Sequence, residues 1–115
     1  MTKEQLKDRM KDKGLVVLNV LSEGNFQKMY IRGSHSQPLE KDPGAFAQEV
    51  ERRYGKVRSF ITYCGGITCA AGPNAAKILR NHGFKAESYP GGLEEWHRAG
   101  WPTDGTLAAG WIDRN

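Results

Sequence analysis

A continuous apolar run near the start of the chain constrains its fold more than any other feature. Residues 15–21 read LVVLNVL, rich in β-branched side chains and without alternation of apolar and polar positions. A strand with one face in water alternates, whereas a strand covered on both faces reads as one apolar run. The run therefore predicts a strand in a parallel sheet that is covered on both sides.

Helical and β-type segments alternate along the rest of the chain. The clearest helical pattern has Asp42 as its cap and Pro43 in its first position, and it ends at Gly55. The other helical segments that we expect are a capped opening helix over residues 2–14, a short turn over 25–29, a helix with Pro73 in its first turn that stops at Gly83, and a segment over 93–96. The other extended segments are expected at residues 31–38, 57–63 and 85–89. Strands alternating with helices at this spacing predict βαβ units and an α/β fold.

Length and charge pattern argue against several classes of protein. The chain has 115 residues, and we expect one domain over 1–115, with a helix over 1–14, a core over about 15–102 and a tail over 103–115. No apolar stretch is long enough to cross a bilayer, and the charged N-terminal segment lacks the apolar centre of a secretory signal. The net charge of +4 is dispersed among alternating acids and bases, so we expect neither nucleic acid nor membrane as a partner. We expect a cytoplasmic protein, in which two cysteines are reduced or catalytic rather than structural.

Cys64 stands where the second β-type run ends and a glycine loop begins. Residues 59–69 read SFITYCGGITC, and a helix is expected directly after them. In a parallel sheet this position lies at the carboxyl edge, where open α/β folds bind their ligands. Backbone amides of a tight glycine loop and the start of a helix stabilise an anion, and therefore a thiolate. The alternative is a buried, inert cysteine that serves as a small apolar residue.

Four short motifs then occur in a fixed order. They are YC at residues 63–64, GF at 83–84, YPGGLEEW at 89–96 and AGWP at 99–102. Together with the expected elements over about residues 15–102, these motifs resemble a single-domain rhodanese. The resemblance implies a rhodanese-like α/β fold with a central parallel sheet of about five short strands and helices on both faces.

The same resemblance implies a transferase of the thiosulfate sulfurtransferase type. In that family a cysteine thiolate takes a sulfane sulfur from a small anionic donor, such as thiosulfate or a persulfide, becomes a persulfide, and passes the sulfur to cyanide, a thiol or an accepting protein. Cys64 is the catalytic residue that the resemblance implies, with neither a metal nor an organic cofactor. Its amide donors would come from an active-site loop that also binds the substrate, made of Gly65, Gly66, Ile67, Thr68 and Cys69.

This chain departs from the family pattern at positions that matter for the site. Many members carry Asp and Arg where this chain has Asn19 and Leu21, so the support that those residues give the active-site side is weakened or rebuilt. Many active loops also carry a cation for the sulfonate of the donor, whereas residues 65–72 hold none. Donor binding then depends on the loop amides, on Thr68 or on a basic residue from elsewhere. The lack of an arginine argues against the related cysteine phosphatases, which use one to bind phosphate.

The second cysteine leaves alternatives open. We favour Cys69 as a first-turn helix residue that packs under the loop. It is also close enough in sequence to pair with Cys64, or to resolve a persulfide or sulfenate on Cys64. A competing function for the whole chain is a non-catalytic rhodanese-like module for protein interaction or redox sensing.

Several other residues carry specific expectations. Trp96 is expected to anchor the core with its indole N–H on a carbonyl, and Tyr63 to be a packing residue. Gly91 and Gly92 are expected to form a turn with positive φ close to the cysteine loop. His82 is expected to bind carbonyls at a helix end, and Trp111 has no assigned place.

Overall fold

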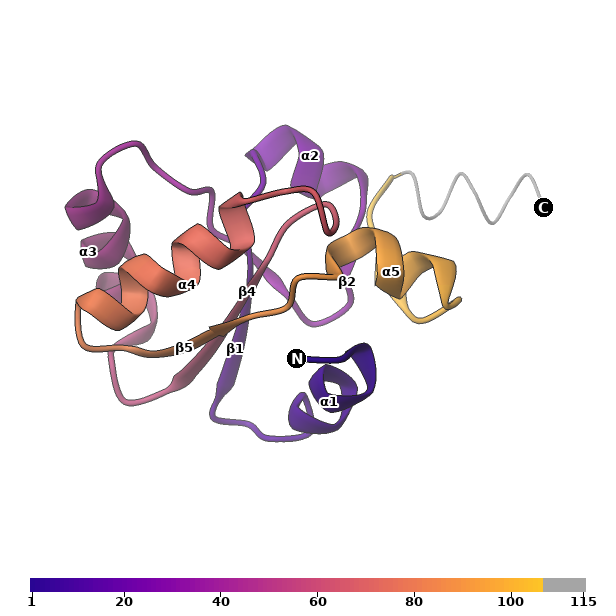
Figure 1. The fold of residues 1–115 in the computed structure, drawn as a ribbon, viewed down its shortest axis with the longest axis horizontal. Coiled ribbons are helices and arrows are strands. Elements are labelled where there is room, and N and C mark those ends of the chain that lie inside the picture. The colour runs from indigo at the N-terminus through magenta and orange to yellow at the C-terminus, as the bar shows by residue number, and fades with distance from the viewer. Residues whose placement is uncertain (107–115) are drawn as a thin grey trace.

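A parallel sheet forms the centre of the computed structural model, which describes residues 1–106 (Figure 1). Its strand order is β3-β1-β4-β5, and all three neighbouring pairs are parallel. The strands are β1 (Leu15–Asn19), β3 (His35–Ser36), β4 (Ser59–Tyr63) and β5 (Lys85–Ser88). The helices are α1 (Lys3–Arg9), α2 (Glu23–Lys28), α3 (Pro43–Tyr54), α4 (Ala71–Asn81) and α5 (Gly92–Arg98). The predicted α/β class with a parallel sheet is confirmed.

The central sheet has four strands among the described residues, where the sequence led us to expect about five. Two further strands, β2 (Tyr30–Ile31) and β6 (Thr103–Asp104), pair with each other in a separate antiparallel ribbon. Gly33, with a φ of +90°, breaks the expected extended segment 31–38 into β2 and β3. Strands of two residues carry no recognisable pattern, so β6 was not expected. Trp111 lies outside the described residues.

Both faces of the sheet are apolar because successive side chains of β1 and β4 point to opposite sides. Val16, Leu18 and Phe60 pack with α3 and α4, whereas Val17 and Ile61 pack with α1 and α5. Figure 1 shows α3 and α4 on one side of the strands and α1 and α5 on the other. This arrangement explains why the sequence of β1 does not alternate.

The helix ends follow the expected local chemistry. The side chain of Asp42 caps α3, Pro43 is its first residue, and Gly55 ends it with a φ of +77°. Thr2 forms the predicted capping box of α1, but that helix ends at Arg9 and not at Gly14, because the chain turns away after Met10. Within residues 1–106, no helix has the length and apolar character that crossing a membrane requires.

Candidate active site

The loop that begins at Cys64 lies at the carboxyl edge of the sheet. β1 and β4 pair in parallel with Asn19 opposite Tyr63, so the two strands end side by side. From β1 the chain first adds β3 on one side and later β4 on the other. Strand order therefore reverses between β1 and β4, and such a switch point leaves a crevice at the carboxyl ends of the strands.

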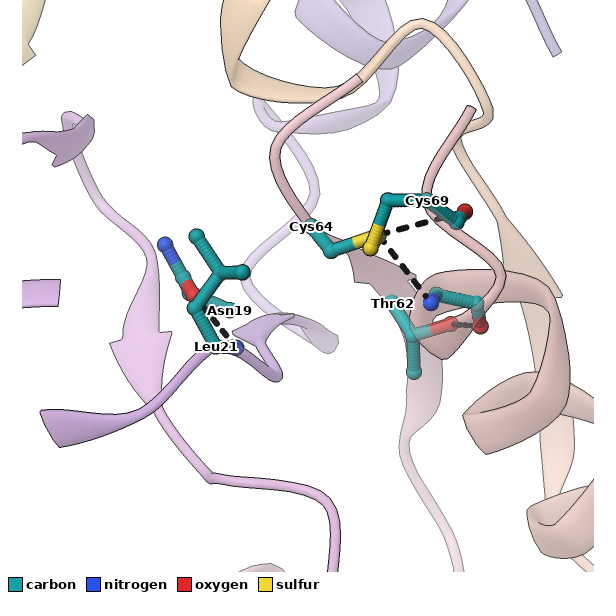
Figure 2. The surroundings of a disulfide bond; sticks show 6 residues. Asn19, Leu21, Thr62, Cys64 and Cys69 are labelled. Atoms are coloured by element: carbon teal, nitrogen blue, oxygen red, sulfur yellow. Dashed lines mark hydrogen bonds between the residues drawn. A yellow bond between two sulfur atoms is a disulfide. The ribbon is translucent and has the colours of Figure 1, made fainter. Parts of the chain in front are cut away.

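Cys64 and Cys69 are joined by a disulfide across the loop, with their Cα atoms 6.4 Å apart (Figure 2). A turn closed by the Cys69 amide on the Gly66 carbonyl, at 3.0 Å, brings the chain back toward Cys64. Cys69 packs against the apolar cluster under the loop, as expected. It is not a helix residue, however, because α4 begins only at Ala71, and it is bonded to Cys64.

The sulfur of Cys64 is buried and lies against the start of α4. Cys64 is 2% exposed, its Sγ accepts the Gly72 N–H at 3.3 Å, and it lies 3.4 Å from the Cys69 carbonyl oxygen. Thr62 fastens this helix start to β4, because its hydroxyl donates to the Gly72 carbonyl at 2.6 Å. The Gly72 N–H and the N-terminus of α4 therefore place a hydrogen-bond donor and positive potential at the Cys64 sulfur.

The first carbonyls of the loop accept hydrogen bonds from α5, whereas most of the loop amides have no protein acceptor within residues 1–106. The Leu93 amide donates to the Cys64 carbonyl at 2.9 Å, and the Glu94 amide donates to the Gly65 carbonyl at 2.8 Å. Gly92 permits this approach, since its φ is +63° and a Cβ there would lie 2.5 Å from the Cys64 oxygen. Within the part of the chain that the structure describes, no protein acceptor takes the amide protons of Gly65, Gly66, Ile67 and Thr68.

The expected glycine turn is thus present, with positive φ at Gly92 only. Gly91 has a φ of −61° and precedes α5. The sequence reading treated the two glycines alike because nothing local distinguishes them. A Cβ added at Gly92 would meet the backbone of Cys64 and Gly65, whereas one added at Gly91 would meet the Glu95 side chain.

Basic side chains reach the rim of the site from other elements. Lys3 and Arg98 line a cavity of about 410 Å³ together with Ile67, which is 78% exposed at the tip of the loop. Arg98 forms an ion pair with Glu94 at 2.9 Å, and the Glu94 carboxylate also lies next to Gly66. Both cations are paired with acids, since Lys3 forms an ion pair with Glu4. The cavity that they line contacts the loop through Ile67.

Tyr63 has a polar role beneath the site that sequence reasoning missed, since it was expected only to pack. Its buried hydroxyl accepts the Ile31 amide at 3.0 Å and the Asn19 side-chain amide at 3.1 Å, and it lies 2.7 Å from the Ser34 hydroxyl. Asn19 in turn accepts the Leu21 amide at 2.9 Å (Figure 2). Burial raises the pKa of Tyr63, so the phenol stays neutral.

Asn19, one of the two departures from the family pattern, belongs to this network. The network joins the end of β1, the β2–β3 turn and the end of β4 through uncharged groups. A parallel alignment of the two predicted strands sets Asn19 opposite Tyr63. Two polar groups that face each other in a buried position are expected to hydrogen-bond, so this register was the available signal for the network.

Two further expectations are confirmed. The Trp96 indole N–H donates to the Pro102 carbonyl at 2.9 Å, and Nδ1 of His82 lies 2.8 Å from the Ile78 carbonyl at the end of α4. Trp101, which sequence reasoning did not place, packs edge-on to Trp96, and Lys7 lies over its ring.

Comparisons with known proteins agree with this architecture. The crystal structure of the BH2092 protein from Bacillus halodurans is similar with a TM-score of 0.80 and 24% identity, covering 93% of this chain and 77% of that one. The solution structure of the rhodanese-like domain of the Alr3790 protein from Anabaena sp. is similar with a TM-score of 0.78 and 22% identity. The match covers 94% of this chain and 80% of that one.

A curated relative is the HTH-type transcriptional regulator Rv0324 of Mycobacterium tuberculosis, 26% identical over 104 residues. The alignment covers 90% of this chain and 44% of the regulator, so the chain spans less than half of that protein. The model of the rhodanese-like domain family matches residues 2–99, including α1. Because this match covers most of its length, the chain belongs to the rhodanese-like domain family.

Proposed function

We propose that the protein is a sulfurtransferase that carries a sulfane sulfur on Cys64. The observation that carries this proposal is the surroundings of the Cys64 sulfur. It lies at the sheet's carboxyl edge, accepts the Gly72 amide, and is followed by the amides of residues 65–68, which have no acceptor within residues 1–106. A persulfide anion is stabilised by such donors without a metal or an organic cofactor.

The transfer takes place in two displacements once the disulfide is open. The Cys64 thiolate attacks the outer sulfur of thiosulfate, the donor S–S bond breaks, and sulfite leaves with the electron pair. The acceptor, a thiolate or cyanide, then attacks the outer sulfur of the Cys64 persulfide. Cys64 leaves as a thiolate, and the sulfur departs as a new persulfide or as thiocyanate.

Uncharged surroundings favour persulfide donors over thiosulfate. Residues 65–72 carry no charge, and the nearby cation Arg98 is paired with Glu94. Thiosulfate, a dianion, therefore finds few charge-assisted contacts here, whereas the less charged persulfide group needs fewer of them. We place the protein in the cytoplasm, where thiol reductants open the Cys64–Cys69 bond and supply the acceptor.

Intact mass spectrometry tests sulfur loading without interference from the second cysteine. We expect reduced Cys69→Ser protein to gain one sulfur atom from glutathione persulfide and, more slowly, from thiosulfate. Cys64→Ser, checked for folding by circular dichroism, should gain none. Addition of cyanide to the loaded Cys69→Ser protein should remove the sulfur as thiocyanate. If Cys69→Ser acquires no sulfur from either donor, the proposal is wrong.

The disulfide favours a second candidate, a redox-sensing module without turnover. Two cysteines that can form and break a disulfide are sufficient to respond to an oxidant. In addition, one relative is named as a transcriptional regulator. In that case the pair would open and close with the thiol–disulfide ratio while no donor adds sulfur to Cys64. The same mass measurement separates the two candidates, because only the sulfurtransferase gains mass.

A further inference from the structure

We infer that Cys69 is a resolving thiol that releases the sulfur held on Cys64 as hydrogen sulfide. This inference rests on the proposed function, since it needs a Cys64 persulfide. It adds a second outcome at the same site: the sulfur is either passed to an acceptor or reduced and discharged, with a dithiol as the final reductant.

The reach of Cys69 is the first argument. Its sulfur is bonded to the Cys64 sulfur in the structure, and the 3.0 Å turn bond from Cys69 to Gly66 holds the two ends of the loop together. The reduced pair therefore keeps the Cys69 thiolate beside the inner sulfur of a Cys64 persulfide. An attacking group held in this way has a high effective concentration compared with a free thiol.

Burial decides which sulfur each nucleophile can attack. The inner sulfur is that of Cys64, which is 2% exposed and lies between the start of α4 and the loop. An external thiol therefore meets the outer sulfur first, and this attack transfers it. Cys69 forms part of the wall around the inner sulfur, and attack from there has the opposite result.

The step balances in atoms and electrons. The Cys69 thiolate attacks the inner sulfur of the Cys64 persulfide, and a bond forms between the two cysteine sulfurs. The bond from Cys64 to the outer sulfur breaks, and the outer sulfur leaves with the electron pair and takes up the proton that the Cys69 thiol gave up, so that it departs as HS⁻. The sulfane sulfur is reduced by two electrons, and the two cysteines are oxidised to the disulfide seen in the structure.

The same surroundings assist departure and regeneration. The leaving hydrosulfide is an anion next to the open amides of Gly65 to Thr68. A dithiol then attacks the more accessible Cys69 sulfur, and Cys64 leaves as a thiolate that accepts the Gly72 N–H. A second dithiol sulfur displaces Cys69, which restores both thiols and leaves the reductant as its own disulfide.

A single-turnover experiment without added reductant tests this role, and the one equivalent of glutathione that loading releases is the same for both proteins. Reduced, desalted wild-type protein and Cys69→Ser are each mixed anaerobically with one equivalent of glutathione persulfide. Sulfide is measured by methylene blue formation, and free thiols are alkylated before intact mass analysis. We expect wild type to release sulfide at least about tenfold faster than Cys69→Ser and to end as the unalkylated disulfide, while Cys69→Ser keeps the sulfur.

The outcomes separate this inference from the proposed function. If Cys69→Ser loads sulfur and wild type keeps it equally long, Cys69 has no resolving role. A wild-type product that retains the sulfur between the two cysteines as a trisulfide, without sulfide release, also overturns it. If Cys69→Ser takes up no sulfur at all, the proposed function itself fails, and the inference fails with it.

Discussion

The hydroxyl of Tyr63 holds together three segments under the site. It joins Asn19 of β1, the Ile31 amide and the Ser34 hydroxyl, all of which are buried. Buried donors of this kind need partners, so the network stabilises the folded chain and fixes the strand end that carries Cys64. At the residue scale, this is the clearest point where the sequence indicated packing and the structure adds a polar role.

Removing this hydroxyl should destabilise the fold. In Tyr63→Phe the Asn19 and Ile31 donors lose their shared acceptor, and we expect the free energy of unfolding to fall by about 1–3 kcal/mol. Urea denaturation followed by tryptophan fluorescence measures this loss. Tyr30→Phe is a matched control, because it keeps the ring that stacks on Phe26 and removes a hydroxyl that makes no hydrogen bond within residues 1–106, and it should stay within about 0.5 kcal/mol of wild type. Equal losses in both variants would contradict the assigned role.

His35 should make part of the stability depend on pH. Partial burial, with a smaller contribution from Arg53, lowers the pKa of His35 below its ordinary value of 6.5. The unfolded chain then takes up this proton more readily than the folded one. Stability due to His35 is therefore present above pH 6.5 and is lost as the pH falls from there toward the folded-state pKa.

Two measurements check the His35 prediction. An NMR titration of the imidazole should give a midpoint below 6.5 in the folded protein. Denaturation at about pH 7.5 and about pH 5.5 should show a smaller loss of stability in His35→Gln than in wild type. A midpoint at or above the ordinary value would show that the environment does not disfavour the charged ring.

At the scale of elements, α5 and the loop after β4 form one unit. The first amides of α5 bind the Cys64 and Gly65 carbonyls, and Gly92 fits between them. The YPGGLEEW segment and the cysteine loop were both recognised in the sequence, but their hydrogen bonds were not. They are distant in the chain, and only the parallel pairing of β4 with β5 brings them together.

A side chain at Gly92 should separate α5 from the loop. Gly92→Ala places a Cβ 2.5 Å from the Cys64 carbonyl oxygen at a positive φ, so we expect a loss of about 2 kcal/mol or more. The amides of residues 93 and 94 should then exchange faster in hydrogen-exchange mass spectrometry.

Gly24→Ala is the matched control for that substitution. Gly24 lies in α2 with open space around it and without a positive φ, so the change should stabilise the protein by about 0.4–1 kcal/mol. Gly92→Ala protein that unfolds at the wild-type urea concentration would refute the role of this contact.

Element boundaries were predicted best where a single side chain terminates a helix. α3 begins and ends as expected because Asp42, Pro43 and Gly55 act locally. β1 ends at Asn19, two residues before the apolar run ends. The Val20 amide still donates to the Tyr63 carbonyl at 3.0 Å, whereas the Leu21 amide donates to the Asn19 side chain at 2.9 Å. The run is longer than the strand because Val20 remains buried beyond the end of β1.

At the scale of the whole molecule, the disulfide links the chemistry of the site to the stability of the fold. A cross-link between residues five apart in sequence closes a short loop, and the chain-entropy relation gives about 2 kcal/mol for it. The oxidised protein should therefore unfold at a higher urea concentration than the reduced one. The state left after sulfide release would be the more stable one.

Denaturation with and without dithiothreitol measures this difference. We expect reduction to lower the free energy of unfolding of wild type by about 2 kcal/mol and to leave Cys69→Ser unchanged. The slope of the transition can also change, because the reduced unfolded chain is less constrained. If wild type and Cys69→Ser respond equally to the reductant, the cross-link does not contribute.

The sequence by itself determined the α/β class, the sheet covered on both faces, most helix ends and the position of Cys64 after a strand. These features depend on patterns within a few residues, such as the unbroken run of β1 and the caps of α3. It left open whether Cys69 packs or pairs, because both fit the same spacing.

Only the tertiary structure showed that Cys69 is bonded to Cys64, that Tyr63 hydrogen-bonds to Asn19, and that amides of α5 bind the loop carbonyls. Tyr63 and Asn19 are 44 positions apart in the sequence, and the parallel register of β1 and β4 brings them into hydrogen-bond distance. Contacts between distant residues depend on strand order and close approach in space, which no local pattern contains.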